Sequence, residues 1–168
     1  SIDAPTGQAV SGGTGTGKDW KYRITAVKDE TFEESLPSAT ATLSNKDTPT
    51  SSAPNVVTWA AVTGATEYNI YREKAVPTAT TSDGFYGFIG IASGTTFNDD
   101  GSVSPDFTDT PPSARNPFDS ADNYPSTAAY FQQRHLFAST NNEPETVFGS
   151  RSANFKNFTV SSPLQDDD

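Results

Sequence analysis

The stretch Ser11–Val27 reads SGGTGTGKDWKYRITAV, and its two halves point to different structures. The first half matches the opening of a phosphate-binding loop, because Gly12 is followed after four residues by Gly17 and Lys18. That loop needs a hydroxyl side chain after the lysine and then a helix, whereas this chain continues with Asp19 and with apolar residues at every second position. Alternation is the period of a β-strand. We therefore interpret the glycine-rich half as a turn between two strands and not as a nucleotide site.

The chain of 168 residues has the composition of a β-rich protein. A third of the residues are hydrophobic, and Ser, Thr, Gly, Pro, Asn and Asp are abundant, which favours short strands and turns over long helices. No apolar run approaches the roughly 18 residues of a membrane-spanning helix, so we expect no membrane insertion. The absence of Cys excludes a thiolate metal site. A net charge of −10 disfavours specific nucleic-acid binding.

Alternating runs recur along the first two thirds of the chain and predict a two-sheet β-sandwich for residues 1–111. The runs are Trp20–Val27, Ala39–Leu43, Asn55–Trp59, Tyr68–Arg72, Phe85–Ala92 and Thr95–Phe97. The inward residues are expected to be Trp20, Tyr22, Ile24, Leu43, Val57, Trp59, Tyr68, Ile70, Ile89, Ile91 and Phe97. Both tryptophans are in phase with apolar neighbours, so we expect them in the core and not as ligand platforms.

Two groups of residues in this region resemble parts of a fibronectin type III domain. Trp20-x-Tyr22-x-Ile24-x-Ala26-Val27 with Glu34-Ser35-x-Pro37-Ser38 resembles the last two strands of that family. Val57-x-Trp59 with Gly64-Ala65-Thr66-x-Tyr68-x-Ile70-Tyr71-Arg72 resembles its second and third strands. Their order along this chain is the reverse of the family's order. Either the sandwich is circularly permuted or two incomplete modules lie in tandem, and we favour permutation because each half alone has too few strands to cover a core.

A second region begins after a change of composition at Pro105–Pro117, and residues 112–123 are predicted to be a linker. Residues 124–168 contain two short predicted strands around Gln133–Arg134, followed by Glu145–Arg151 and Phe155–Phe158. About 45 residues form a single sheet, one face of which stays exposed unless it packs on a neighbour. We therefore expect the incomplete beginning of a larger β domain, such as a first propeller blade.

This second region also carries the more specific resemblance. The stretches Tyr124-Pro125, Tyr130–Thr140 (YFQQRHLFAST), Glu143–Arg151 and Asn154–Phe158 are together similar to part of the tail nozzle proteins of short-tailed phages. That family is also called tail tubular protein B or packaged-DNA stabilisation protein. The resemblance implies a virion component, a subunit of a homo-oligomeric ring that contacts other tail or portal proteins and serves assembly and DNA retention or ejection. It brings no catalytic residues with it, and we expect no enzyme activity, no cofactor and no metal.

The candidate site residues have competing structural explanations. His135 is the one histidine of the chain, so a His cluster for zinc cannot be built, and we predict a structural role although one His could act as a base. Arg134 is predicted to pair with Glu143 or Glu145, or with a neighbouring subunit.

Two acidic stretches hold fragments of a calcium-loop pattern. They are Asn98–Gly101 and Asp106–Asp109, and Asp-Gly turns between strands explain them equally well. The terminal Asp166–Asp168 is expected to be solvated.

A carbohydrate-binding or adhesive accessory module of a tail fibre or secreted enzyme is the alternative function. Under it, Tyr71, Phe85, Tyr86 and Phe88 would be exposed and would stack on sugars. An enzyme ranks third, because no nucleophile, base and orienting partner can be assembled from these motifs.

Overall fold

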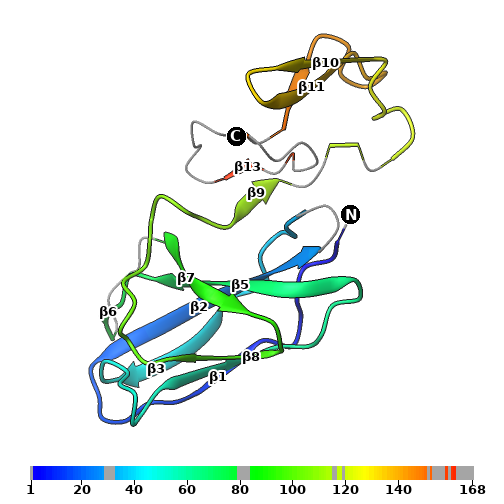
Figure 1. The fold of residues 1–168 in the computed structure, drawn as a ribbon. Helices are drawn as coiled ribbons and strands as arrows, with labels where there is room; N and C mark the ends of the chain where they lie inside the picture. Colours follow the sequence, from blue (N-terminus) through cyan, green and yellow to red (C-terminus); the bar gives the residue numbers. More distant parts are fainter. Residues whose placement is uncertain are drawn as a thin grey trace.

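The computed structural model describes residues 2–28, 33–78, 84–114, 117–118, 120–150, 152, 158 and 160–161, and the regular elements in them are β-strands (Figure 1). The strands are β1 (Ala9–Gly12), β2 (Lys18–Lys28), β3 (Ala41–Lys46), β4 (Asn55–Thr58), β5 (Ala65–Glu73), β6 (Val76–Pro77), β7 (Tyr86–Ala92), β8 (Thr96–Asp99), β9 (Pro112–Ala114), β10 (Thr127–Phe131), β11 (Arg134–Ala138), β12 (Val147–Gly149) and β13 (Val160–Ser161). Their pairings are antiparallel. Within these residues there is no helix that meets the length and apolarity needed to cross a bilayer.

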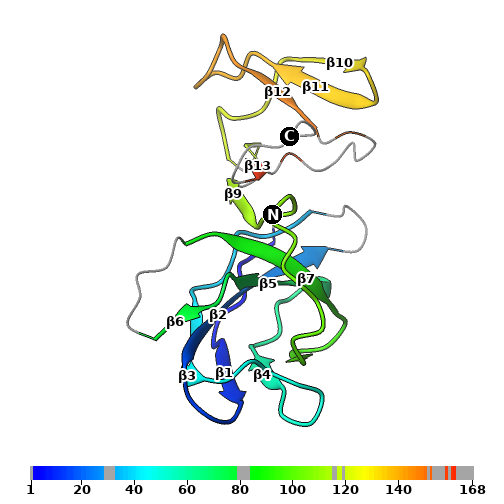
Figure 2. The same cartoon turned by 90° about the vertical axis from the view of Figure 1, so that its left-hand side faces the viewer.

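Strands β1 to β8 form two sheets that share one hydrophobic core (Figures 1 and 2). One sheet has the order β3-β2-β5-β7, with β6 also paired to β2, and the other has the order β1-β4-β8. Ile24 of β2, Ile70 of β5 and Val57 of β4 are fully buried in the same cluster. Trp20 and Trp59 lie in that cluster as well. The prediction of an all-β fold with both tryptophans in one core is confirmed.

The glycine-rich segment that opened the sequence lies between β1 and β2. β1 ends at Gly12 and β2 begins at Lys18, so the residues between them connect two strands, as the sequence predicted. Gly12 has a φ of 90°, and a Cβ there would lie 2.4 Å from the carbonyl oxygen of Pro54. Glycine is therefore required at this position for close packing of two backbone segments, which has nothing to do with phosphate.

Most of the predicted core is confirmed. Eight of the predicted residues are buried, and Leu43 and Phe97 pack partly buried against them. The eight are Trp20, Tyr22, Ile24, Val57, Trp59, Tyr68, Ile70 and Ile89. The core also contains Ile2, which no alternating run predicted, and Ala26, which follows Trp20, Tyr22 and Ile24 in the same alternation but was not among the inward residues named above. The prediction for Ile91 is wrong, because its side chain is 55% exposed.

A β-bulge explains the error at Ile91. Tyr71 pairs with Phe88 and Ile70 pairs with Gly90, so β7 contains one residue more than β5 at this point. The extra residue reverses the alternation, which keeps Ile89 inside and turns Ile91 outward. The Phe97 ring fills the space that a side chain at position 90 would need, because a Cβ on Gly90 would lie 3.0 Å from that ring.

The Glu34-Ser35-x-Pro37-Ser38 segment completes the edge of β2 beyond its pairing with β3. The hydroxyls of Ser35 and Ser38 accept hydrogen bonds from the amides of Ala26 (2.9 Å) and Ile24 (3.1 Å). The amides of the two serines donate in return to the carbonyl oxygens of the same two residues. These side chains thus replace a neighbouring strand, and the predicted hairpin between β2 and β3 is confirmed.

The second region contains a three-stranded sheet of order β10-β11-β12. The predicted pair of short strands around Gln133–Arg134 is confirmed as the β10–β11 hairpin. Its two-residue turn holds Gln132 at a φ of 45° and Gln133 at a φ of 61°, a conformation that glycine and asparagine adopt more readily. In both views this sheet stands apart from the first two sheets (Figures 1 and 2).

The segment interpreted as a linker, residues 112–123, has structure of its own. Strand β9 lies within it and pairs with β13, so the chain returns to this segment near its end. The Phe118 ring makes edge contacts with Phe137, Phe148 and Phe158, at centroid distances of 5.1 to 5.2 Å. Three of the predicted features lie outside the described residues: the strand from Phe155, the acidic end Asp166–Asp168 and Arg151.

Candidate functional site

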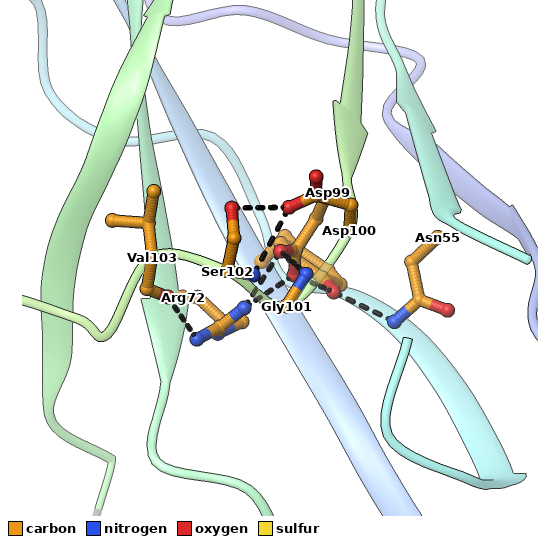
Figure 3. A network of polar contacts seen from close by, with 8 residues as sticks. Asn55, Arg72, Asp99, Asp100, Gly101, Ser102 and Val103 are labelled. Carbon is orange, nitrogen blue, oxygen red and sulfur yellow. Dashed lines mark hydrogen bonds and ion pairs between the residues drawn. The ribbon is translucent and has the colours of Figure 1, made fainter. Parts of the chain in front are cut away.

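The first acidic stretch contributes to a buried ion pair between the two sheets (Figure 3). Asp99, the last residue of β8, accepts hydrogen bonds from Nη1 of Arg72 at 2.7 and 2.6 Å, and the two side chains are 3% and 7% exposed. Arg72 also donates through Nη2 to the carbonyl oxygen of Val103 at 2.6 Å. The guanidinium lies 5.5 Å from the centre of the Trp20 ring. The pair therefore joins the two sheets inside the core.

A tyrosine and an asparagine extend this network. The hydroxyl of Tyr22 donates to Asp99 at 2.7 Å and accepts from Nδ2 of Asn55 at 2.8 Å. Burial first, and then the charge of Asp99, raise the pKa of the Tyr22 phenol far above its ordinary value. The phenol therefore keeps its proton and acts as a donor, which is the role that a structural hydrogen bond requires.

One carboxylate in each acidic stretch accepts hydrogen bonds from its own turn. Asp100 accepts hydrogen bonds from the amide and the hydroxyl of Ser102, and these bonds lower its pKa. Asp106 does the same with Thr108, with the same effect on its pKa. No group of three or more His, Cys, Asp or Glu side chains that could hold a metal gathers among the described residues. The turn explanation of these stretches accounts for their geometry.

Two of the four aromatic residues predicted to be exposed are buried, and that part of the prediction is wrong. Tyr71 is fully buried. Its hydroxyl donates to Glu34 at 2.6 Å, and Asn69 donates to the same carboxylate. Burial and the charge of Glu34 raise the pKa of this phenol well above 10. Tyr86 is 5% exposed.

The other two aromatic residues differ from each other. Phe88 is half-buried, with its ring centre 5.9 Å from that of Tyr71. Phe85 is 56% exposed and is the one residue of the predicted set that offers an open ring.

Phe85 lines a hollow of about 420 Å³ on the outer side of the larger sheet. The sheet contributes Arg23 and Tyr86 to it, the Ser35–Ser38 segment contributes Leu36 and Pro37, and Pro111–Ser113 closes it from the side of β9. We call this site the Arg23 hollow. Its volume lies in the lower part of the range of about 300–1,000 Å³ that small-molecule sites occupy.

Arg23 is held in place in this hollow by two contacts. Its guanidinium lies 4.6 Å from the centre of the Tyr86 ring, and its Nε donates to the hydroxyl of Thr40 at 3.2 Å. The hydroxyls of Thr40 and Tyr86 are themselves 3.0 Å apart. Sequence analysis did not select Arg23, because a basic residue at an outward position of a strand is ordinary and its ring partner lies on another strand.

The residues selected in the second region take structural positions. The ring of His135 lies 4.0 Å from that of Tyr130 and 5.2 Å from that of Phe137, and its backbone amide donates to the hydroxyl of Ser150. Arg134 donates to the carbonyl oxygen of Ser150 at 3.3 Å. Its predicted partner Glu143 accepts a hydrogen bond from Thr146. The structural reading of His135 therefore agrees with its contacts.

One face of the second-region sheet is uncovered. Phe137 and Phe148 point to the face on which Phe118 and Phe158 pack. The opposite face carries Ala129, Phe131, Leu136, Ala138 and Val147, which we call the apolar sheet face, together with Thr127 and Arg134. Phe131 and Val147 are 61% and 64% exposed. A groove of about 190 Å³ is lined by Thr127–Ala129, Leu136–Ala138 and Val147.

Comparisons of the chain with protein-family models, with curated proteins and with solved structures found no match.

Proposed function

We propose that this chain is a non-enzymatic structural component of the tail of a short-tailed phage, a part of a nozzle or tail-tube subunit located in the virion. The proposal starts from the resemblance of Tyr124–Phe158 to the tail nozzle proteins. The observation that carries it is the apolar sheet face, with Phe131 and Val147 more than half exposed. An exposed apolar surface of this kind is typical of a protein that is buried against a partner.

In this proposal the second region is the first blade of a propeller. Its apolar sheet face packs against a following blade or a neighbouring subunit of a homo-oligomeric ring, which also contacts other tail or portal proteins. Blades of propellers are small sheets that cover one another in this way. The described sheet has one covered and one uncovered face, which supports such a position.

The first region serves as a fibronectin type III-like module attached to that body. The arrangement of strands supports a circularly permuted module, since the tyrosine strand β2 and the tryptophan strand β4 lie in different sheets around one core. Strands β2 and β3 precede β4 and β5 in the chain, although β2 is bonded to β5 within one sheet. A tandem of two incomplete modules would place the two tryptophans in separate cores.

The mechanism is mechanical and electrostatic. Subunits pack through edges and loops, and acidic surfaces let DNA pass without adhering, because like charges repel the phosphate backbone. The chain's net charge of −10 suits this role.

The test is the parent protein at full length. Its gene should continue a propeller after Asp168, and the purified protein should form closed rings in electron micrographs, or join rings when mixed with portal particles. A parent gene that encodes a hydrolase or a fibre repeat would contradict the proposal.

A second candidate function is glycan binding by the first region. The observation that favours it is the Arg23 hollow, in which Phe85 offers an exposed ring beside a fixed guanidinium. Aromatic platforms in a concave site are a common means of holding ligand rings.

A further inference from the structure

The Arg23 hollow contains a cation whose hydrogen-bonding capacity is only partly used. Nε of Arg23 donates to Thr40, and the face of the guanidinium rests on Tyr86. Among the described residues no carboxylate lies within ion-pair distance of Arg23, and its two terminal nitrogens donate to none of them. Two acidic side chains on this face of the sheet have other partners: Glu34 is engaged by Thr25, Asn69 and Tyr71, and Glu73 is paired with Lys21.

The state of Arg23 contrasts with that of two other basic residues on the larger sheet. Arg72 is paired with Asp99, and Lys21 is paired with Glu73 at 3.3 Å. The Arg23 guanidinium is thus fixed by a ring and a hydroxyl and has no carboxylate among the described residues at ion-pair distance. Its two terminal nitrogens form the fork that receives a carboxylate in a bidentate manner.

We propose that the Arg23 hollow binds an acidic sugar of the uronic acid type, with its carboxylate on Arg23 and its pyranose ring on Phe85. A uronate carries a flat apolar ring face and a carboxylate in one small unit, which matches the exposed ring and the guanidinium that line this hollow. The volume of about 420 Å³ accommodates one or two such units. The inference rests on the glycan-binding candidate and goes beyond it by naming the class of sugar.

A sugar fits the surroundings better than a peptide carboxylate does. Extended peptides bind by adding a strand to an open sheet edge. The edge of β7 beside the hollow is already closed, because the amide of Phe88 donates to the carbonyl oxygens of Asp106 (3.1 Å) and Asp109 (3.0 Å), and Asp106 donates back to Phe88 at 2.9 Å. A compact ligand is held by side chains and needs no such edge.

The acidic surface of the chain makes the expected binding weak and dependent on salt. Repulsion by the net negative charge slows the approach of an anion and is screened as ionic strength rises. Salt screens both this repulsion and the attraction of the carboxylate to Arg23, so the affinity changes with ionic strength through two opposing effects. Titrations are best compared at one fixed ionic strength.

The test is a titration of the whole 168-residue chain followed by amide and arginine side-chain resonances in NMR spectra. The probes are the sodium salt of methyl α-galacturonide, its uncharged methyl ester, sodium acetate and acetyl-dialanine. We expect the uronate to bind about tenfold more tightly than its ester, with shifts at Arg23 and Phe85, since a charge-assisted bidentate contact is lost in the ester.

Variants separate the two contacts. Arg23→Gln should remove the preference for the uronate over the ester, and Arg23→Lys should restore part of it. Phe85→Ala should weaken both sugars to a similar degree. Phe131→Ala is the matched control, because Phe131 is similarly exposed but lies outside the hollow, and it should change neither affinity. Circular dichroism verifies that each variant is folded.

Each outcome decides between the claims. Equal binding of uronate and ester would overturn the acidic-sugar inference and leave glycan binding in place. Binding of neither sugar would overturn both. Acetate or acetyl-dialanine binding as tightly as the uronate would overturn the inference by showing a general carboxylate site. Loss of the uronate preference in Arg23→Gln, with the control unchanged, would support it.

Discussion

The two sheets before Pro112 cover each other, whereas the sheet of β10–β12 is covered on one face only. In the first region, side chains from both sheets meet in one core that includes both tryptophans. In the second region, Phe118 and Phe158 cover one face, and the apolar sheet face stays open. Sheets need a second layer to exclude water from an apolar face. The comparison teaches that the first region buries its apolar sheet faces within itself, whereas the second leaves one apolar face exposed to water.

The largest expected effect comes from the buried ion pair of the first region. Asp99→Asn leaves the Arg72 guanidinium buried without a counter-charge, and we expect a loss of about 3–5 kcal/mol in the free energy of unfolding. Urea unfolding followed by tryptophan fluorescence measures it, since both tryptophans lie in this core. The control Asp100→Asn alters a half-buried turn residue of the same loop that forms no ion pair among the described residues, and it should cost much less. Equal losses in the two variants would show that the network does not hold the sheets together.

Alkaline pH should destabilise the first region next. The phenols of Tyr22 and Tyr71 have pKa values raised above the unfolded value of 10.0, so the native state holds these protons more tightly than the unfolded chain does. Below pH 10 the contribution of these two phenols to the free energy of unfolding does not change with pH. Above pH 10 this contribution decreases, by about 3 kcal/mol for both phenols together at pH 11. Urea midpoints at stepwise pH values measure this. Tyr71→Phe should reduce the slope above pH 10 by about half, and an unchanged slope would contradict the assignment.

The aromatic cluster of the second region should be separable from the first region. Phe118→Ala removes the ring that contacts Phe137, Phe148 and Phe158, and we expect a local loss of about 2 kcal/mol, since this ring is only partly buried. Hydrogen exchange of β10–β12 should accelerate, while the unfolding transition seen by tryptophan fluorescence stays in place. A shift of that transition would mean that the two regions unfold as one unit. The exposed Phe131→Ala is the control.

The smallest expected effect is a stabilisation. Gln132 and Gln133 both hold positive φ angles in the two-residue turn of the β10–β11 hairpin. Replacing them with Asn-Gly relieves the cost of that conformation and should stabilise the hairpin by about 1 kcal/mol. Slower hydrogen exchange of β10 and β11, with unchanged exchange in β2, would show that the hairpin is stabilised. Faster exchange would show that the glutamine side chains make a contact that the turn needs.

Sequence analysis predicted what depends on local pattern. The alternation in Trp20–Val27 and Asn55–Trp59 predicted both the strands and their inward faces, because a strand with one buried face leaves this period in its sequence. The sequence placed Glu34-Ser35-x-Pro37-Ser38 correctly in the connection between β2 and β3. It did not predict the role of the two serines, since their partners are backbone amides of β2.

What could not be predicted depends on distant partners. The exposure of Ile91 follows from a bulge that is defined only by the pairing with β5. The burial of Tyr71 follows from Glu34, which lies on a loop that folds over the outer face of the sheet. The position of Arg23 depends on Tyr86, and the strand at Pro112–Ala114 depends on β13. None of these pairs leaves a signal in a single stretch of sequence.

The ion pair between Arg72 and Asp99 also has a consequence for when the core of the first region can close during synthesis. As the chain leaves the ribosome, β2 and β3 emerge first and β5 follows with its arginine, but the carboxylate that neutralises this arginine arrives only with the last strand of the two sheets. Burial of the guanidinium before then would leave it without a counter-charge, which disfavours closure of the interior around it. We therefore expect a nascent chain that stalls before Asp99 to remain open.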